Sequence, residues 1–245
     1  MLTKMGSMWY YIPVDEVFCM TRTKLKDRIL PPYTRGEEIM NMTTHILGGI
    51  IGIVALILCV VTAVKHHNIY GVVGGSIFGA AMIMLFTISS IYHGLRPHLT
   101  AKKVFQVIDH CAIFVLISGT YTPIVLCTLR EVNPVVGWAY FGIVWAVAAL
   151  GIALNAVDLK KYSTFSLICY LALGWCIIFN IRTVALGIGF GGMMLLAGGG
   201  IAYTIGAVLY ALGKKKKAKF VHSVFHIFVD IGSLLHFLCI LFYVM

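Results

Sequence analysis

Charged side chains are scarce in this sequence, and acidic ones are the scarcest. Only 11% of the 245 residues are charged and 60% are apolar, with 9 Asp and Glu against 19 Lys and Arg. Soluble domains carry about 25% charged residues and about 45–50% apolar ones. The composition therefore excludes an ordinary soluble domain and indicates a protein integral to the membrane.

The seven cysteines lack the paired spacing of a disulfide framework or of a thiolate metal site. Most of them lie inside apolar runs, so we expect them to be packing residues. Short segments of alternating hydrophobicity are also lacking. The apolar runs are instead long, which favours transmembrane helices over a transmembrane β-barrel.

The formal net charge of +10 is compatible with nucleic-acid binding. The chain nevertheless has no basic groove with interleaved aromatic residues, and we expect no nucleic-acid partner. Basic residues in a membrane protein hold the cytoplasmic loops on their side of the bilayer.

Seven apolar stretches have about the 20 residues that a helix needs to cross the hydrocarbon. They are residues 44–64, 70–92, 107–128, 135–154, 164–182, 192–212 and 222–244. We therefore predict an all-α fold, an integral membrane bundle of seven transmembrane helices. Residues 1–43 form an N-terminal cytoplasmic segment and residues 44–245 form the membrane domain.

The first residues contain an apolar run, Met8 to Val14, that is too short to span a membrane. No small-residue cleavage site follows it, so we predict no signal peptide. Met20 would be a sensible start for the functional chain. The basic segment from Thr21 to Arg35 is typical of a cytoplasmic interfacial stretch.

Orientation follows from the distribution of Lys and Arg. The N-terminal segment and the second, fourth and sixth connections hold sixteen of them, whereas the other connections and the C-terminus hold three. This bias predicts that the N-terminus is cytoplasmic and the C-terminus outside. We expect a multi-pass protein of the cell (plasma or inner) membrane.

Glycines recur at four-residue spacing in the first two spans. Gly48 and Gly52 lie in the first, and Gly71, Gly75 and Gly79 in the second. Small residues at this spacing let helices approach closely, so we expect contact faces without chemistry.

The last span carries ionisable residues, which are costly inside a membrane and often mark a functional site. His222 and His226 are four residues apart and share one helix face, and Asp230 lies one further turn along. The predicted topology places Ser89, His93 and Asp109 in the same cytoplasmic leaflet as the two histidines.

Three neutral imidazoles, here His93, His222 and His226, with one open position are typical of a catalytic zinc site. Zinc lowers the pKa of its water from about 15.7 towards 7. Asp109 is the candidate proton acceptor, and Ser89 is placed to hydrogen-bond a reaction oxyanion. The alternative is that these histidines are polar packing residues or members of a proton relay.

The remaining ionisable residues are assigned no ligand role. His236 lies about 15 Å beyond His226 on a helix and is expected to make polar packing contacts. His45 is a candidate neighbour of the site, and His110 points away from Asp109. His66, His67 and His98 are expected to be solvated, and Asp230 to pair with an imidazole N–H or a basic group.

Together these residues resemble the motif set of the hemolysin III family. That family belongs with the progestin and adipoQ receptors and the alkaline ceramidases in a superfamily of seven-span proteins. The matching stretches are Ser89-x3-His93, Asp109-His110, His222-x3-His226, Glu38–Asn41 with Thr44-His45, Gly119–Pro123 and residues 222–237. The resemblance covers residues 34 to 245. It implies zinc ligands at the three histidines, with Asp109 and Ser89 around the zinc water.

Three functions fit this pattern. The first is a zinc-dependent hydrolase of lipid amides or esters, with a membrane lipid as substrate. The second is a channel-forming cytolysin, which the name hemolysin implies. The third is a receptor or membrane-homeostasis protein with structural zinc. The sequence leaves the choice of lipid or signal and the oligomeric state open.

Overall fold

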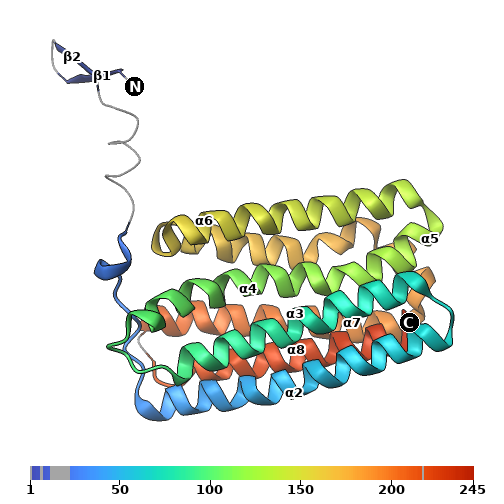
Figure 1. The fold of residues 1–245 in the computed structure, drawn as a ribbon. Helices are drawn as coiled ribbons and strands as arrows, with labels where there is room; N and C mark the ends of the chain where they lie inside the picture. Colours follow the sequence, from blue (N-terminus) through green and yellow to red (C-terminus); the bar gives the residue numbers. More distant parts are fainter. Residues whose placement is uncertain (1, 6–7, 12–22, 217) are drawn as a thin grey trace.

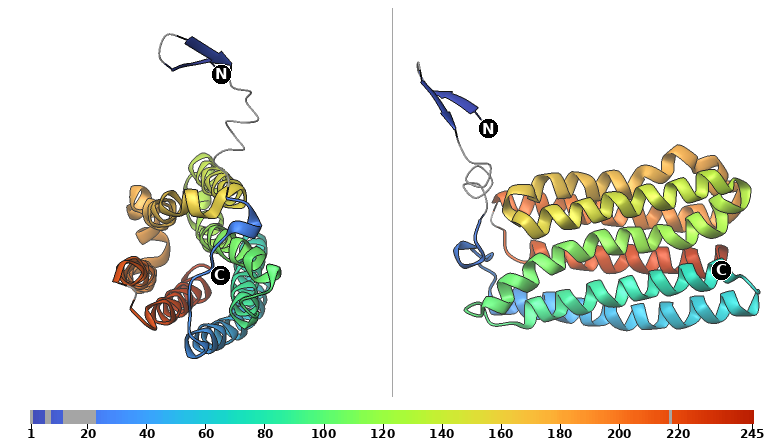
Figure 2. Two further views of the ribbon diagram at one scale, coloured as in Figure 1. Left: turned by 90° about the vertical axis from the view of Figure 1, so that its left-hand side faces the viewer. Right: turned by 45° about the horizontal axis from the view of Figure 1, so that its top comes forward.

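The computed structural model describes residues 2–5, 8–11, 23–216 and 218–245, so that Met20 lies outside the described residues. Beyond residue 34 the described secondary structure is entirely helical, and the helices run alongside one another in an elongated bundle (Figures 1 and 2). The all-α prediction is confirmed for this bundle. The N-terminal residues add an unexpected hairpin of β1 (Leu2–Met5) and β2 (Met8–Tyr11). A short 3₁₀ turn, η1 (Leu25–Asp27), precedes the bundle.

Side-chain caps fix where the first two long helices begin. Helix α2 (Arg35–Lys65) starts at Thr34, which forms a capping box with Glu37: each side chain bonds the other's backbone N–H. Helix α3 (Ile69–Gly94) starts at Asn68, whose side-chain oxygen accepts the N–H of Gly71 at 2.8 Å. Because α2 begins at Arg35, it starts inside the predicted N-terminal segment of residues 1–43.

The predicted glycine faces join α2 to α3. A Cβ at Gly79 would lie 2.5 Å from Leu56 Cα, and one at Gly75 would lie 2.9 Å from the Cβ of Cys59. A Cβ at Gly52 would lie 3.1 Å from the backbone nitrogen of Ile83. The two backbones are therefore too close for larger side chains, which confirms the contact-face prediction.

Helix α4 (Thr100–Ile124) continues through a π-helical turn, η2 (Val125–Leu129), into α5 (Arg130–Val132). Pro123 lies inside α4 one residue before its end. Proline has no N–H to donate and clashes with the carbonyl four residues earlier, which explains why regular α-helix geometry ends there.

The chain then runs through α6 (Pro134–Trp175), a 3₁₀ turn η3 (Cys176–Asn180) and α7 (Ile181–Lys216). Two residues break this stretch. Asp158 is non-helical, with φ −155° and ψ 94°, and Gly189 has φ 64°. The Asp158 carboxylate accepts the N–H groups of Lys160 and Lys161 at 3.1 Å and that of Thr23 at 2.7 Å. It therefore caps the helix that follows it and anchors the N-terminal segment.

Five helical segments of the described chain are long and apolar enough to cross a membrane. They are Arg35–Lys65, Ile69–Gly94, Thr100–Val132, Pro134–Gly213 and Val221–Tyr243. The fourth has 80 residues and contains the predicted spans 135–154, 164–182 and 192–212. A multi-pass helical membrane protein is thus supported, whereas the count of seven spans is not established by these segments.

The last helix, α8 (Val221–Tyr243), returns through the bundle. Figure 1 places the starts of α2 and α8 and the α3–α4 connection at one end, with the C-terminus at the other. His66 is exposed, as expected, and its Nδ1 lies 2.9 Å from the Met245 carbonyl at the end of the bundle that holds the C-terminus. All six described cysteines are free.

Candidate metal site

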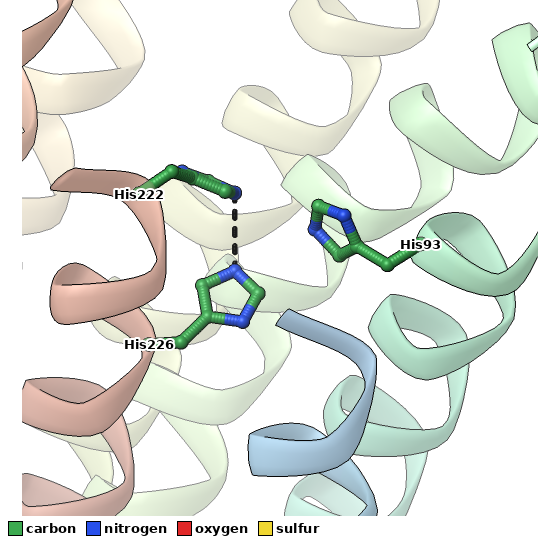
Figure 3. Close-up of side chains that lie close together, drawn as sticks. All are labelled: His93, His222 and His226. Carbon is green, nitrogen blue, oxygen red and sulfur yellow. Dashed lines mark hydrogen bonds between the residues drawn. The ribbon is translucent and has the colours of Figure 1, made fainter. Parts of the chain in front are cut away.

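Three histidines meet at the end of the bundle where α2 and α8 begin. His93 comes from the last turn of α3, and His222 and His226 come from the first turns of α8. One ring nitrogen of each lies within 4.8 Å of the others (Figure 3). The structure therefore brings together the three residues that the sequence pattern selected.

The two histidines of α8 face each other because they are one helical turn apart. Their Nε2 atoms are 3.0 Å apart. His226 Nδ1 lies 3.3 Å from the backbone carbonyl of Asn41 in α2. A carbonyl only accepts hydrogen bonds, so it places the proton of His226 on Nδ1 and leaves the Nε2 lone pair directed at His222 Nε2.

His93 is held in the corresponding way by a carboxylate. Its Nδ1 lies 2.6 Å from Glu38 Oε2, whereas its Nε2 is buried and has no hydrogen-bond partner. His222 Nδ1 is also buried without a partner. Buried polar atoms without partners cost free energy, so these nitrogens are suited to binding an additional group.

The three imidazoles fit a metal ion. Zinc–nitrogen bonds of about 2.0–2.1 Å place neighbouring ligand atoms of a tetrahedron about 3.3 Å apart. The 3.0 Å between His222 and His226 is close to that value, and the ligand atoms of all three histidines lie within 4.8 Å of one another. Imidazole suits zinc, copper, iron and nickel, so the donor set alone selects no single metal.

Asp109 and Ser89 lie beside His93, on α4 and α3. Both are buried, and the Asp109 carboxylate is close enough to interact electrostatically with His93 and with Ser89. His110 directs its Nδ1 at the Gln106 carbonyl of its own helix, 2.9 Å away.

Asn41 joins the elements around the histidines and was not predicted to do so. It is fully buried, and its side-chain oxygen accepts the hydroxyl of Ser223 at 2.6 Å while its backbone holds His226. Its amide nitrogen lies 3.3 Å from His93 Nδ1. The sequence signal was the spacing of Glu38, Asn41 and His45, which places all three on one face of α2.

The sequence places Lys102 in the polar connection between the second and third predicted spans, whereas the structure shows that its side chain is buried. Its side chain is only 2% exposed and its ammonium lies 2.8 Å from Glu38 Oε1. It also donates to the backbone carbonyls of Tyr92 and Leu95, both at 2.9 Å. A lysine can be buried here because three acceptors satisfy its three donors.

Two aromatic rings cover the cluster. Tyr33, just before α2, stacks on His222 with ring centroids 5.0 Å apart and an interplanar angle of 15°. His45 of α2 stacks on His226 with centroids 3.7 Å apart and an angle of 9°. His45 is therefore a neighbour of the site, as the sequence suggested.

The deeper ionisable residues of α8 lie apart from the trio. Asp230 points towards α2, where a Cβ on Gly48 would lie 2.6 Å from its Oδ1, and this oxygen has no hydrogen-bond partner. The expected partner for Asp230 is therefore absent from the described residues. His236 Nε2 lies 3.0 Å from the carbonyl of Leu196, which is a polar packing contact.

The fold and the site together define a class: multi-pass α-helical membrane proteins with three clustered histidines, two buried and one partly buried, at one end of the bundle. Comparison with known proteins supplies the family. A family model described as Haemolysin-III related matches residues 33–237, and the chain belongs to this family. The resemblance expected from the motifs is thereby confirmed.

Individual relatives agree with this assignment. The chain is 38% identical to Hemolysin-3 of Bacillus cereus over 209 residues, which cover 85% of this chain and 92% of the relative. It is 35% identical to the Hemolysin-3 homolog of Bacillus subtilis (strain 168), over 86% and 96% of the two chains. The monocyte to macrophage differentiation factor of Rattus norvegicus is 26% identical over 67% of each chain.

Proposed function

We propose that this protein is a zinc-dependent hydrolase of lipid amides or esters that acts within the membrane. The observation that carries the proposal is the cluster of His93, His222 and His226, whose ligand atoms lie within 4.8 Å of one another. Asp109 and Ser89 lie beside His93 and supply groups that hydrolysis needs. When bound, zinc would act as a Lewis acid and lower the pKa of water to about 7.

Two residues of the chain would handle the proton and the developing charge. The Asp109 carboxylate would accept a proton from the attacking water as its oxygen adds to the carbonyl carbon of the lipid. The Ser89 hydroxyl would donate a hydrogen bond to the oxyanion on that carbonyl. The C–N or C–O bond then breaks, and the proton passes from Asp109 to the leaving amine or alcohol.

An open metal position favours catalysis over a structural metal. Structural zinc sites are closed by four protein ligands, whereas catalytic sites keep one position free. Among the described residues, the group of side chains whose ligand atoms lie within 4.8 Å of one another consists of three histidines. A receptor or homeostasis role with structural zinc would need a fourth ligand, such as Asp109.

We also propose seven membrane passes with the N-terminus in the cytoplasm and the C-terminus outside. An uninterrupted helix of 80 residues would be about 120 Å long, which is four times the hydrocarbon thickness of about 30 Å. Pro134–Gly213 is instead broken at Asp158 and Gly189, and three passes of this segment account for its length. Sixteen of nineteen basic residues then lie on the cytoplasmic side of a plasma or inner membrane.

Fatty-acid release from vesicles that contain amide-linked and ester-linked lipids tests the hydrolase proposal. We expect Asp109→Ala to keep the metal and to lose turnover by about 10²-fold or more, because a positioned general base contributes about 10²–10⁴-fold. Asp230→Asn is the matched control, since this buried carboxylate faces α2 rather than the histidines. Unchanged turnover in Asp109→Ala would count against the hydrolase.

The names of the two Bacillus relatives favour a second candidate, a cytolysin. Leakage of dye from liposomes at low concentrations of purified protein would support it. Vesicles that stay sealed while their lipids are hydrolysed would instead support the enzyme.

A further inference from the structure

Glu38 connects the metal site to a buried positive charge. Its two carboxylate oxygens divide their contacts: Oε2 lies 2.6 Å from His93 Nδ1 and Oε1 lies 2.8 Å from Lys102 Nζ. The side chains of His93 and Lys102 are 0% and 2% exposed, and that of Glu38 is 15% exposed. Glu38 is thus held between two nearly inaccessible partners, each from a different helix.

We propose that Glu38 is a positioning residue that fixes the tautomer and the orientation of His93. This inference rests on the proposed metal-dependent function. An ionised carboxylate only accepts hydrogen bonds, and its 2.6 Å contact is shorter than the 3.3 Å approach of the Asn41 amide nitrogen to the same atom, so the proton of His93 lies on Nδ1. The Nε2 lone pair is then directed away from Glu38, and Nε2 is the nitrogen that is buried without a partner.

Lys102 in turn fixes Glu38. Its ammonium donates to the carbonyls of Tyr92 and Leu95 at the end of α3, and its third donor holds the carboxylate. The last turn of α3 also carries His93, so one lysine connects the backbone beside His93 with the carboxylate that orients its ring. Its charge also balances that of Glu38 in a poorly solvated place.

The linked contacts of His93, Glu38 and Lys102 predict a defined effect on metal affinity. A carboxylate on the far nitrogen of a ligating histidine orients the ring and increases its basicity, and loss of such a partner weakens metal affinity by about 10–100-fold. A merely structural ion pair between α2 and α4 would change stability instead and leave the metal affinity as it was.

The test is zinc affinity of the full-length protein in detergent, measured by competition with a chromogenic chelator. We expect Glu38→Gln to bind Zn²⁺ about 10–100-fold more weakly than wild type. Its Co²⁺ form should also show shifted ligand-field absorption bands, because the geometry of His93 at the metal changes. Glu37→Gln is the control, since Glu37 contacts Thr34 and the N–H of Phe220 and no histidine.

Glu38→Asp provides a second variant in case Glu38→Gln does not fold. It keeps the negative charge for Lys102 but shortens the reach to His93, so we expect weaker zinc binding and near-normal thermal stability. Wild-type affinity and an unchanged cobalt spectrum in Glu38→Gln or Glu38→Asp would overturn the positioning role alone. Equal weakening in the Glu37 control would overturn it as well. A wild-type protein that binds neither ion would overturn both this role and the proposed function.

Discussion

His45 lies flat against His226, with ring centroids 3.7 Å apart and planes 9° apart. Both nitrogens of His45 are buried without a hydrogen-bond partner, and its ring makes a T-shaped contact with Phe86, with centroids 5.1 Å apart. The His45 ring therefore supports the proposed metal ligand His226 by packing, although a histidine could itself bind the metal.

Replacement of His45 by phenylalanine separates these two roles. We expect His45→Phe to keep the metal and to change the free energy of unfolding by less than about 1.5 kcal/mol, because a ring of similar size keeps the stack. Elemental analysis and thermal unfolding of the purified variant measure both quantities. Loss of the metal from a folded His45→Phe protein would show instead that His45 is a fourth ligand.

Gly48 provides the space that Asp230 occupies. A Cβ at Gly48 would lie 2.6 Å from Asp230 Oδ1 and 2.7 Å from the ring of Phe86. We expect Gly48→Ala to destabilise the protein by about 1–3 kcal/mol through overpacking. Thermal unfolding in detergent is the measurement, and the additional change Asp230→Ala should restore part of the loss.

The adjacent glycine is the matched control for that experiment. A Cβ at Gly49 would meet Phe86 Cβ at 3.8 Å, which is ordinary contact. Gly49→Ala should therefore be neutral or stabilising by up to about 1 kcal/mol, since alanine favours the helix. Equal destabilisation by the two substitutions would contradict the close contact of Asp230 with α2.

Tyr33 makes the stability of the folded protein depend on pH in the alkaline range. Burial raises the pKa of its phenol above the ordinary value of 10.0 in the folded protein. The folded state therefore keeps this proton at a pH where the unfolded chain releases it, and stability falls as pH rises above about 10. Below that pH both states are protonated, and Tyr33 contributes no pH dependence.

Comparison with Tyr33→Phe isolates this contribution. Above pH 10 the wild type should lose up to about 1.4 kcal/mol per pH unit relative to the variant. Thermal unfolding at a series of pH values from 8 to 11 checks this. Parallel curves across the whole range would show that the Tyr33 phenol is solvated and does not cover His222.

The histidine trio could be predicted because it depends on two simple rules. Residues four apart share a helix face, which relates His222 to His226. The distribution of Lys and Arg then indicates which ends of the spans lie together, which brings His93 to the same level. Neither rule requires knowledge of how the helices pack.

The partners of the trio could not be predicted from these rules. Glu38 meets His93 because α2 packs against α3, and the amphipathic pattern of α2 does not specify that pairing. Lys102 lies in the polar connection between the second and third predicted spans, and only the three acceptors around it explain its burial.

The two breaks in the long fourth segment lie in gaps that the sequence predicts between spans, since residues 155–163 contain Asp158 and residues 183–191 contain Gly189. Asp158 reads as one residue of a polar loop, although its carboxylate caps a helix and holds Thr23. Gly189 lies in a stretch with several other glycines, and the residue that adopts a positive φ cannot be selected from composition. The sequence therefore indicates where this segment is interrupted, whereas the residues that make the breaks come from the structure.

Metal content tests the central claim most directly. Elemental analysis of detergent-purified wild type, prepared without chelators, should give about one zinc per chain, as three imidazole ligands and one open position require. The same preparation of His226→Ala should contain none while remaining folded. Absence of zinc from the wild type, or equal zinc in the variant, would contradict the metal site and return the histidines to polar packing or proton relay.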